Sequence, residues 1–340
     1  MSEAVNGAPE GAGAGQRAEA EADPPTEVHA EARPPAVRAR PRARLPARRP
    51  PPAPRVSQPG LPDAPPTYDP DLERVEIEVL LEAIFRHYGF DFRSYAYASI
   101  RRRLWKRLQA EGLKTISALQ ADVLHSPEAM ERLLLDLSVN VTSMFRDPGF
   151  YKAFRRDVVP LLRTYPFIRI WHAGCSTGEE VYSMAILLQE EGLYERARIY
   201  ATDINDVVLQ KARSGIFPLE RMQEYTENYI RAGGSRSFSE YYTAKYGGAL
   251  FSPSLTRNVV FAQHNLVTDR SFSEFNVIFC RNVLIYFEKT LQNRVHSLFY
   301  ESLAMFGVLA LGSKESLRFS KYEPCYERIH PTEKIYRKVR

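Results

Sequence analysis

The sequence predicts an α/β fold, a mostly parallel sheet with helices on both faces, preceded by a small all-α domain. From about residue 167 onward, short apolar runs alternate with amphipathic helical stretches, which is the pattern of a parallel sheet. Residues 71–138, by contrast, show helical periodicity. Hydrophobic residues make up 44 % of the 340 residues and charged residues 26 %, so the chain can bury a sizeable core.

The first 70 residues differ in composition from the rest of the chain. They hold 16 of the 24 prolines, nine arginines and nine acidic residues, with almost no aromatic side chains. The acids dominate up to Glu31, and eight arginines without an acid occupy residues 32–62. Because such a segment cannot bury enough apolar surface to offset its ordering entropy, we expect residues 1–70 to be a disordered tail. Its Arg-rich part fits a solvated linker, which we favour, or a segment that binds nucleic acid, an acidic partner or anionic lipid.

The composition also limits which cell compartment and which kinds of site we expect. No apolar run approaches 18 residues, so we expect no transmembrane segment, and the N-terminus lacks the features of a secretory signal. The three cysteines, Cys175, Cys280 and Cys325, are widely spaced and form no C-x-x-C motif. We therefore expect a cytoplasmic protein without a disulfide framework and without a metal site.

Four helices are predicted in the all-α domain. The first begins at about Leu72 and ends at Gly89, since apolar residues recur every three or four positions between them. The other three cover Tyr95–Ala110, Ser117–His125 and Pro127–Leu137.

The second of these helices carries a basic ridge. Its predicted core stripe consists of Tyr97, Ile100, Leu104 and Leu108. The cations that we place on the opposite face are Arg102, Arg103, Lys106 and Arg107. We expect all four to be exposed, either as an ordinary solvated face or as a docking surface.

Residues 151–340 hold the predicted sheet domain, which residues 139–150 link to the helices. The predicted strands cover Phe167–His172, Arg198–Thr202, Asn258–Ala262, Phe275–Cys280, Val308–Gly312 and Lys334–Val339. The predicted helices between them cover Gly178–Gly192, Asp206–Ser214 and Lys289–Met305. Residues 216–257 interrupt the alternation with polar, Tyr-rich sequence, which indicates an inserted subdomain.

The strongest local signal lies between the first strand and its helix. The loop there reads Ala173-Gly174-Cys175-Ser176-Thr177-Gly178-Glu179-Glu180, and the next strand ends in Asp203. A glycine loop at a helix N-terminus, followed by an acid that can bind ribose hydroxyls, is a nucleoside-cofactor pattern. The two glutamates disfavour a pyrophosphate and suit the ammonium of a methionine moiety. The pattern therefore favours S-adenosylmethionine over a dinucleotide, with a purely structural turn as the alternative.

The same loop also fits a different reaction class. Its G-x-S-x-G sequence is that of the nucleophile elbow of α/β-hydrolases, with Ser176 as the nucleophile and Asp269 and His330 following in the required order. Two features count against a hydrolase: no Gly-rich oxyanion loop precedes the elbow, and only one strand comes before Ser176.

Two further segments carry polar residues at informative places. A hydrophobic strand ends in Cys280-Arg281-Asn282, and groups at the carboxyl end of a parallel strand face the ligand crevice. The segment Asn140 to Asp147 joins the helices to the sheet and by composition is only a linker. A helix cap at Arg281 and Asn282, with Tyr286 as an ordinary core residue, is the alternative.

Together these segments resemble the CheR family, the chemotaxis-receptor glutamate methyltransferases. The match runs in order from about Arg74 to the C-terminus. It includes the N-x-T-x-x-F-R linker, the loop from Ser176 to Ser183, T-D-I, KARSGIF from Lys211, Asn265-Leu266 and FCRNVLIYF. The resemblance implies a Rossmann-like, S-adenosylmethionine-dependent methyltransferase sheet, a four-helix N-terminal domain and a small antiparallel subdomain inserted at about 216–257.

The resemblance also implies the activity and the site. It implies methyl-ester formation on glutamate side chains of the cytoplasmic methylation helices of chemoreceptors, which the basic ridge (Arg102, Arg103, Lys106 and Arg107) would bind as substrate. The family's cofactor-contacting positions fall on Asn140, Thr142, Arg146, Glu180, Asp203, Asn265, Leu266, Arg281 and Asn282. Arg146 and Tyr286 fall on positions near the transferred methyl group.

This chemistry needs few catalytic groups. A glutamate side chain has an unperturbed pKa of about 4.3, so it is ionised at neutral pH and needs no general base. The rate then comes mainly from positioning in a dry site. The lack of a catalytic His/Asp pair is therefore expected, and we interpret His172 and His264 as packing residues.

Two alternatives remain at this point. A nucleic-acid methyltransferase is suggested by the basic ridge and the Arg-rich tail, but the strand that ends at Cys280 lacks the N/D-P-P-Y/F motif of base-amino methylases. A non-catalytic binding module would need a degenerate cofactor site, whereas every polar position is filled. We expect a monomer without stable nucleic-acid binding.

Overall fold

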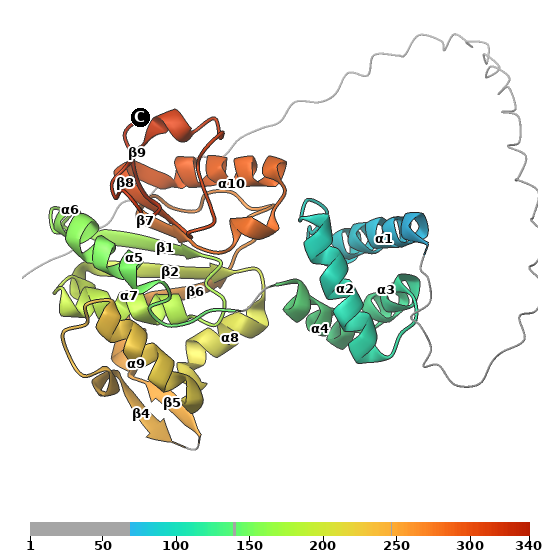
Figure 1. The fold of residues 1–340 in the computed structure, drawn as a ribbon, viewed down its shortest axis with the longest axis horizontal. Coiled ribbons are helices and arrows are strands. Elements are labelled where there is room, and N and C mark those ends of the chain that lie inside the picture. Colours follow the sequence, from blue (N-terminus) through green and yellow to red (C-terminus); the bar gives the residue numbers. More distant parts are fainter. Residues whose placement is uncertain (1–68, 139–140, 246) are drawn as a thin grey trace, which may run out of the picture. The chain divides into compact units, whose positions relative to one another are not determined.

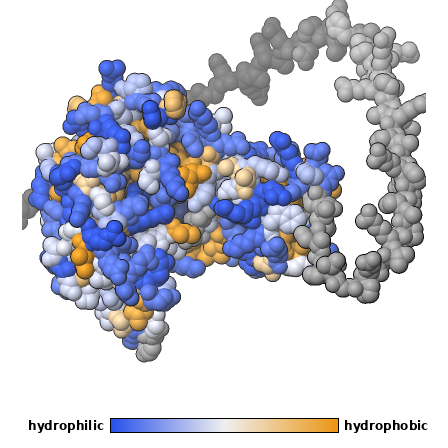
Figure 2. Space-filling view, viewed as in Figure 1, coloured by the Kyte–Doolittle hydropathy of each residue, from blue (hydrophilic) through white to orange (hydrophobic). Residues whose placement is uncertain are grey.

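A computed structural model describes residues 69–138, 141–245 and 247–340 (Figure 1). The prediction of a disordered tail falls, up to residue 68, outside the described residues, as does Asn140. Among the described residues, no helix is both long enough and apolar enough to cross a membrane. On the face that Figure 2 shows, the described surface is mostly hydrophilic, with hydrophobic residues in small groups.

The N-terminal helices form where the sequence predicts them. They are α1 (Pro70–Tyr88), α2 (Tyr97–Glu111), α3 (Ile116–His125) and α4 (Pro127–Leu137). The side chain of Asp69 caps α1, and Gly89 ends it with a φ of 79°, a left-handed conformation that favours glycine. The apolar stripes of the four helices pack into one core, with Leu80, Leu104 and Leu133 fully buried.

The central sheet has seven strands in the order β6-β2-β1-β7-β8-β10-β9. Their bounds are β1 (Ile168–Ala173), β2 (Ala197–Asp203), β6 (Val259–Gln263), β7 (Phe275–Cys280), β8 (Leu303–Leu311), β9 (Tyr326–Arg328) and β10 (Ile335–Lys338). The pairs from β6 to β8 are parallel, and β10 is antiparallel to both of its neighbours. The predicted α/β class is confirmed.

Helices cover both faces of this sheet (Figure 1). They are α5 (Pro148–Ala153), the π-helical turn η1 (Phe154–Val158), α6 (Val159–Leu162), α7 (Glu179–Glu190), α8 (Asp206–Ser214) and α10 (Lys289–Ser302). Ile170 of β1 packs in one core cluster with α5, α6 and α7, whereas Trp171 packs in a second cluster with α10. Successive residues of a strand point to opposite faces, so β1 contributes to both cores.

The insertion is a small antiparallel subdomain, as predicted. Its sheet has the order β3-β5-β4 and consists of β3 (Ile216–Pro218), β4 (Tyr242–Lys245) and β5 (Gly248–Phe251), with α9 (Met222–Arg231) between the first two strands. Short 3-10 turns complete the structure: η2 (Tyr194–Arg196), η3 (Leu219–Arg221), η4 (Phe238–Tyr241), η5 (Pro253–Leu255), η6 (Leu284–Tyr286) and η7 (Glu323–Cys325).

One expectation about these elements is wrong, and one helical segment is absent from the predicted elements. The helix predicted to reach Met305 ends at Ser302, because Leu303 pairs with Phe275 and opens strand β8. The sequence gives no clear boundary there, since the apolar run of Leu303 to Met305 suits a helix and a strand equally. The helical segment from Pro148 to Leu162 was not expected. The division of the chain at residues 70, 138 and 150 stays a prediction.

Candidate active site

One cavity lies where strands β1, β2 and β7 end. β1 lies between β2 and β7, so the carboxyl ends of all three meet at one edge of the sheet. The cavity is lined by these residues: Tyr95, Leu137, Ser138, Val141, Thr142, Ser143, Arg146, Gly174, Cys175, Ser176, Glu180, Asp203, Ile204, His264, Asn265, Leu266, Val267, Arg281, Asn282, Val283, Tyr286 and Phe287. Eight of the nine predicted cofactor positions are among them, and the ninth, Asn140, lies outside the described residues.

The glycine loop brings backbone to the floor of this cavity. Gly174 has a φ of 80°, and a Cβ there would lie 2.6 Å from Cγ2 of Val283, so only glycine fits. The N–H groups of Gly174 and Cys175 both donate to the carbonyl of Thr202, at 2.8 and 2.9 Å. Because these bonds tie the loop to the end of β2, the loop lies beside Asp203.

Asp203 is buried and holds two backbone groups. Its Oδ2 accepts from the N–H of Ser176 at 2.9 Å, and its Oδ1 accepts from the N–H of Asn205 at 3.1 Å. Burial raises the pKa of Asp203, although these backbone donors oppose the shift. Each carboxylate oxygen can accept a further bond. Asp203 can therefore shape the loop and still accept from ribose hydroxyls.

Ion pairs of the buried Arg281 join α7 and the segment before α5 to the end of β7. Nη1 of Arg281 donates to Oε2 of Glu180 at 2.9 Å, and Nη2 of Arg281 donates to Oδ2 of Asp147 at 2.7 Å. Nδ1 of His172 lies 3.0 Å from the other oxygen of Glu180. Burial alone would raise the pKa of Glu180, but the His172 hydrogen bond and the Arg281 charge outweigh it and lower the pKa.

The two glutamates of the loop have different environments. Glu180 lines the cavity, whereas Glu179 is buried away from it and accepts from the hydroxyl of Thr177 at 2.6 Å. Burial raises the pKa of Glu179. Of the two acids in the loop, only Glu180 can therefore bind the ammonium group of a methionine moiety.

Glu315 is a structural part of the site that the sequence did not reveal. Its carboxylate accepts four backbone N–H groups: those of Asn282 at 2.9 Å, Val283 at 2.8 Å, Leu284 at 2.7 Å and Gly312 at 2.5 Å. Burial raises the pKa of Glu315 despite these donors. The bonds fix the turn after β7, in which Asn282 has a φ of 64°. No local motif marks this residue, because three of its four partners lie more than 30 positions earlier.

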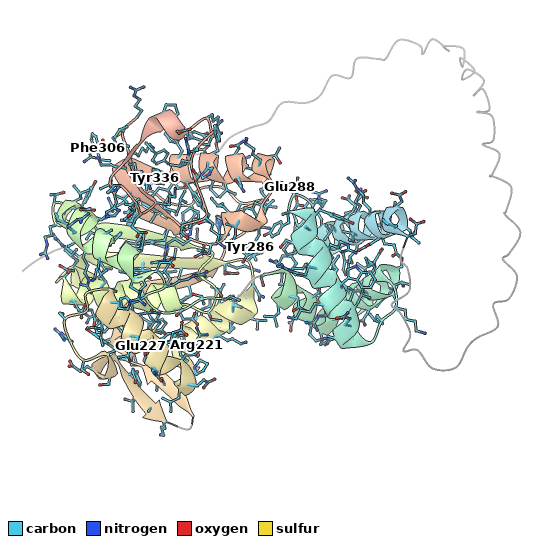
Figure 3. All side chains as sticks on the ribbon, viewed as in Figure 1. Arg221, Glu227, Tyr286, Glu288, Phe306 and Tyr336 are labelled. Carbon is cyan, nitrogen blue, oxygen red and sulfur yellow. The ribbon has the colours of Figure 1, made fainter. Side chains whose placement is uncertain are left out.

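Arg146 and Tyr286 both line the cavity, from different segments. The guanidinium of Arg146 donates to the carbonyl of Val141 at 3.0 Å, and its own carbonyl accepts from Arg281. Tyr286 lies at the end of η6 (Figure 3), and the Cζ of Arg103 lies 4.7 Å from its ring centroid. Both side chains are half-buried, so each can reach a ligand from the rim.

The remaining predicted cofactor positions follow strand β6 or precede α5. Oδ1 of Asn265 accepts from the N–H of Val267 at 2.9 Å, which leaves the amide nitrogen of Asn265 for a ligand. Leu266 and Thr142 line the cavity.

The basic ridge is only partly exposed, which corrects the sequence prediction. Arg103 is 6 % exposed and donates to the carbonyl of Leu137, and burial lowers its pKa. The side chain of Arg107 is 15 % exposed and pairs with Asp136 and Glu111, and Lys106, at 75 %, also pairs with Asp136. At about 100° per residue, Arg103 and Arg107 flank the core stripe rather than oppose it. Tyr97, placed in the stripe, is exposed.

The hydrolase arrangement does not form. Ser176 lines the cavity, but neither Asp269 nor His330 does. Nδ1 of His330 accepts from the N–H groups of Thr332 and Glu333.

The cavity also offers neither a cysteine nucleophile nor a metal site among the described residues. Burial raises the pKa of Cys175 well above its usual value, so this thiol is no thiolate nucleophile. Within residues 69–138, 141–245 and 247–340, no cluster of His, Cys, Asp and Glu could hold a metal ion.

Two family models match this chain. Residues 140–330 match the model of the CheR methyltransferase S-adenosylmethionine-binding domain, and residues 76–138 match that of the CheR all-alpha domain. The chain belongs to the CheR methyltransferase family. Its cofactor is S-adenosylmethionine and its fold is the predicted Rossmann-like methyltransferase fold with an all-α N-terminal domain. The hydrolase hypothesis is therefore wrong.

Relatives cover most of the chain. The Cher3 protein of Pseudomonas putida is 54 % identical over 264 residues, which are 78 % of this chain and 97 % of that protein. Chemotaxis protein methyltransferase 2 of Pseudomonas aeruginosa is 30 % identical, over a region that covers 72 % of this chain and 87 % of that protein. The chemotaxis protein methyltransferase of Listeria monocytogenes is 27 % identical, with coverages of 73 % and 92 %. This CheR-family chain is thus similar to chemotaxis methyltransferases along nearly their whole length.

The residues of the cavity fit S-adenosylmethionine. The buried Asp203 provides acceptors for ribose hydroxyls, and the Glu180–Arg281 pair offers opposite charges for the ammonium and carboxylate of a methionine moiety. The close backbone approach at Gly174, which has no side chain to fill the cavity, suits a ligand that lies across the end of β1.

Proposed function

We propose that this CheR-family protein transfers the methyl group of S-adenosylmethionine to glutamate side chains of chemoreceptors, in the cytoplasm. The observation that carries the proposal is the single cavity that Arg146 and Tyr286 share with Asp203, Glu180 and Arg281. The names of the relatives support chemotaxis as the pathway, and the family supports methyl transfer.

The acceptor chemistry suits these side chains. S-adenosylmethionine, when bound, supplies an electrophilic methyl group. A glutamate carboxylate is ionised at neutral pH, so no residue needs to remove a proton from it. We assign to the Arg146 guanidinium and the Tyr286 hydroxyl the task of orienting that carboxylate by charge and hydrogen bonding. A basic nitrogen acceptor, by contrast, would meet a cation at Arg146.

Cofactor binding is assigned to the remaining cavity residues. Glu180 and Arg281 would hold the methionine moiety, Asp203 the ribose, and Asn265 and Leu266 the base, from the strand ends that flank the cavity. Thr142, Asn282 and the undescribed Asn140 complete the proposed set. These assignments rest on position and chemistry.

The proposal is tested by incubating the protein with methyl-labelled S-adenosylmethionine and receptor-containing membranes from the same cell. We expect label in a receptor band that mild base releases as methanol, because carboxyl methyl esters are base-labile. Label that survives base treatment would indicate N-methylation and contradict the proposal. The Asp206→Ala variant, altered at an exposed carboxylate on α8, serves as the matched control for Asp203→Ala, which should lose the activity.

A further inference from the structure

A strained, cationic loop lies directly behind the turn of the active site. Residues Gly312 to Tyr322 follow strand β8, and the carboxylate of Glu315 ties this loop to the N–H groups of Asn282, Val283 and Leu284. Leu317 and Ser320 are buried as well. The loop is therefore tied to the cavity wall by Glu315 and held in the interior of the domain by Leu317 and Ser320.

Between these anchors the loop presents an aromatic side chain to solvent. Phe319 is 78 % exposed and has a φ of 66°, which a bulky side chain rarely adopts. Oε2 of Glu323 accepts its N–H at 2.8 Å and helps to hold this conformation. Such strain is common at functional sites but does not mark one alone, because the exposed Phe306 has a φ of 64° as well; the cations beside Phe319 distinguish it from Phe306. An exposed, strained phenylalanine gains nothing for the folded core.

Two cations lie beside this ring, and two more are exposed on the same loop. Nζ of Lys289 and Cζ of Arg318 lie 5.5 and 5.8 Å from its centroid, within the range of cation–π contacts. Lys314 and Lys321 are exposed on the same loop. None of the four forms an ion pair with a carboxylate of the described part of the chain. Their charge is therefore available to a partner, whereas Lys106 of α2 is already paired with Asp136.

We propose that the loop Gly312–Tyr322, together with Lys289, is a docking surface on the catalytic domain for the acidic, glutamate-bearing segment of the methyl-accepting protein. The inference rests on the proposed function, because only a substrate whose acceptor groups are glutamates brings a carboxylate-rich surface to this cavity. The positive charges of Arg318 and the three lysines complement those carboxylates. Phe319 supplies an aromatic contact of the kind that is enriched at interface hot spots. The link through Glu315 fixes the distance from this surface to Tyr286.

The test compares loop variants with matched controls in receptor methylation. The loop variants are Phe319→Ala and the double variant Lys314→Glu with Arg318→Glu. Phe306→Ala is the control for the first. Phe306 is also exposed, at 59 %, and also has a positive φ, of 64°. In Figure 3 it lies far from Glu288, the residue that precedes Lys289 of the proposed surface. Lys152→Glu, at an exposed lysine of α5, is the control for charge.

At low salt we expect the double variant to lose about tenfold in kcat/KM for receptor, mainly through KM, and Phe319→Ala to lose several-fold. Calorimetric affinity for S-adenosylmethionine should stay unchanged. Loop variants that methylate receptor like their controls would overturn the inference while leaving the proposed function intact. A wild-type protein that forms no base-labile ester would instead overturn the proposed function.

A second arm separates a protein partner from a membrane. Detergent-solubilised receptor should show the same loss as receptor in membranes. A loss confined to membranes rich in anionic lipid would mean that the loop contacts lipid, and this result would overturn the proposal.

Discussion

The cofactor edge of the sheet and helix α2 both carry charged residues that the sequence singles out, but they use them differently. At the sheet edge, Glu180, Asp203 and Arg281 converge on one cavity, although they are distant in sequence. On α2, Arg103 and Arg107 turn inward to bind Leu137 and Asp136 of α4. A parallel sheet brings strand ends together by its topology, whereas the exposure of a helical residue depends on which neighbours it meets.

The largest effect is expected at the ion pairs of the buried Arg281. Arg281→Ala leaves Glu180, whose side chain is 19 % exposed, with His172 but without its guanidinium partner, so we expect a loss of about 3 kcal/mol in the free energy of unfolding, the low end for a buried pair. Urea unfolding measures this, with Arg213→Ala as the control, because Arg213 pairs at 3.6 Å with an exposed carboxylate. An Arg281→Ala variant as stable as the control would show that this edge is not held together by charge.

The second effect concerns the cofactor. Asp203→Ala should weaken S-adenosylmethionine binding by about 1–3 kcal/mol, since it removes acceptors for the ribose and frees the N–H of Ser176. Calorimetry on Asp203→Ala and on the exposed-site control Asp206→Ala measures the difference. Equal affinities would contradict the assignment of β2 to the ribose.

Much of this edge could be predicted from the sequence, because it depends on local signals. The turn at Gly174 and the acid that ends β2 stand at fixed offsets from apolar strands, so their meeting follows from strand order. Glu315 could not be predicted, since its partners are backbone groups and any buried acceptor could serve them. The burial of Arg103 was missed for a related reason: a free carbonyl at the end of α4 leaves no trace in the residue pattern.

The third effect separates neighbours on α2. Arg103→Ala should lower the free energy of unfolding by about 1–2 kcal/mol, because it leaves the Leu137 carbonyl without its donor. It should also lower kcat, since the guanidinium packs over Tyr286. Arg102→Ala, at an exposed position one residue away, should change stability by less than about 0.5 kcal/mol. If thermal unfolding and kcat respond equally in both variants, the inward role of Arg103 is refuted.

The smallest effect is expected from the exposed part of the ridge. Arg102→Glu with Lys106→Glu should lower receptor methylation several-fold at low salt and less at high salt. The reason is that dissolved salt screens the attraction between exposed charges, over a distance of about 10 Å at ~0.1 M salt. Cofactor affinity should not change. Normal methylation rates at low salt would mean that these two side chains are only solvated.

The central claim is that the cavity directs a methyl group to glutamate carboxylates, and one measurement tests it most directly. Receptor is incubated with the protein and with S-adenosylmethionine that carries a deuterated methyl group, and tandem mass spectrometry then locates the label. The account predicts label on glutamate side chains of the receptor and its loss in the Asp203→Ala variant. Label on lysine, arginine or a nucleic-acid base in the same membranes, with none on glutamate, would contradict it.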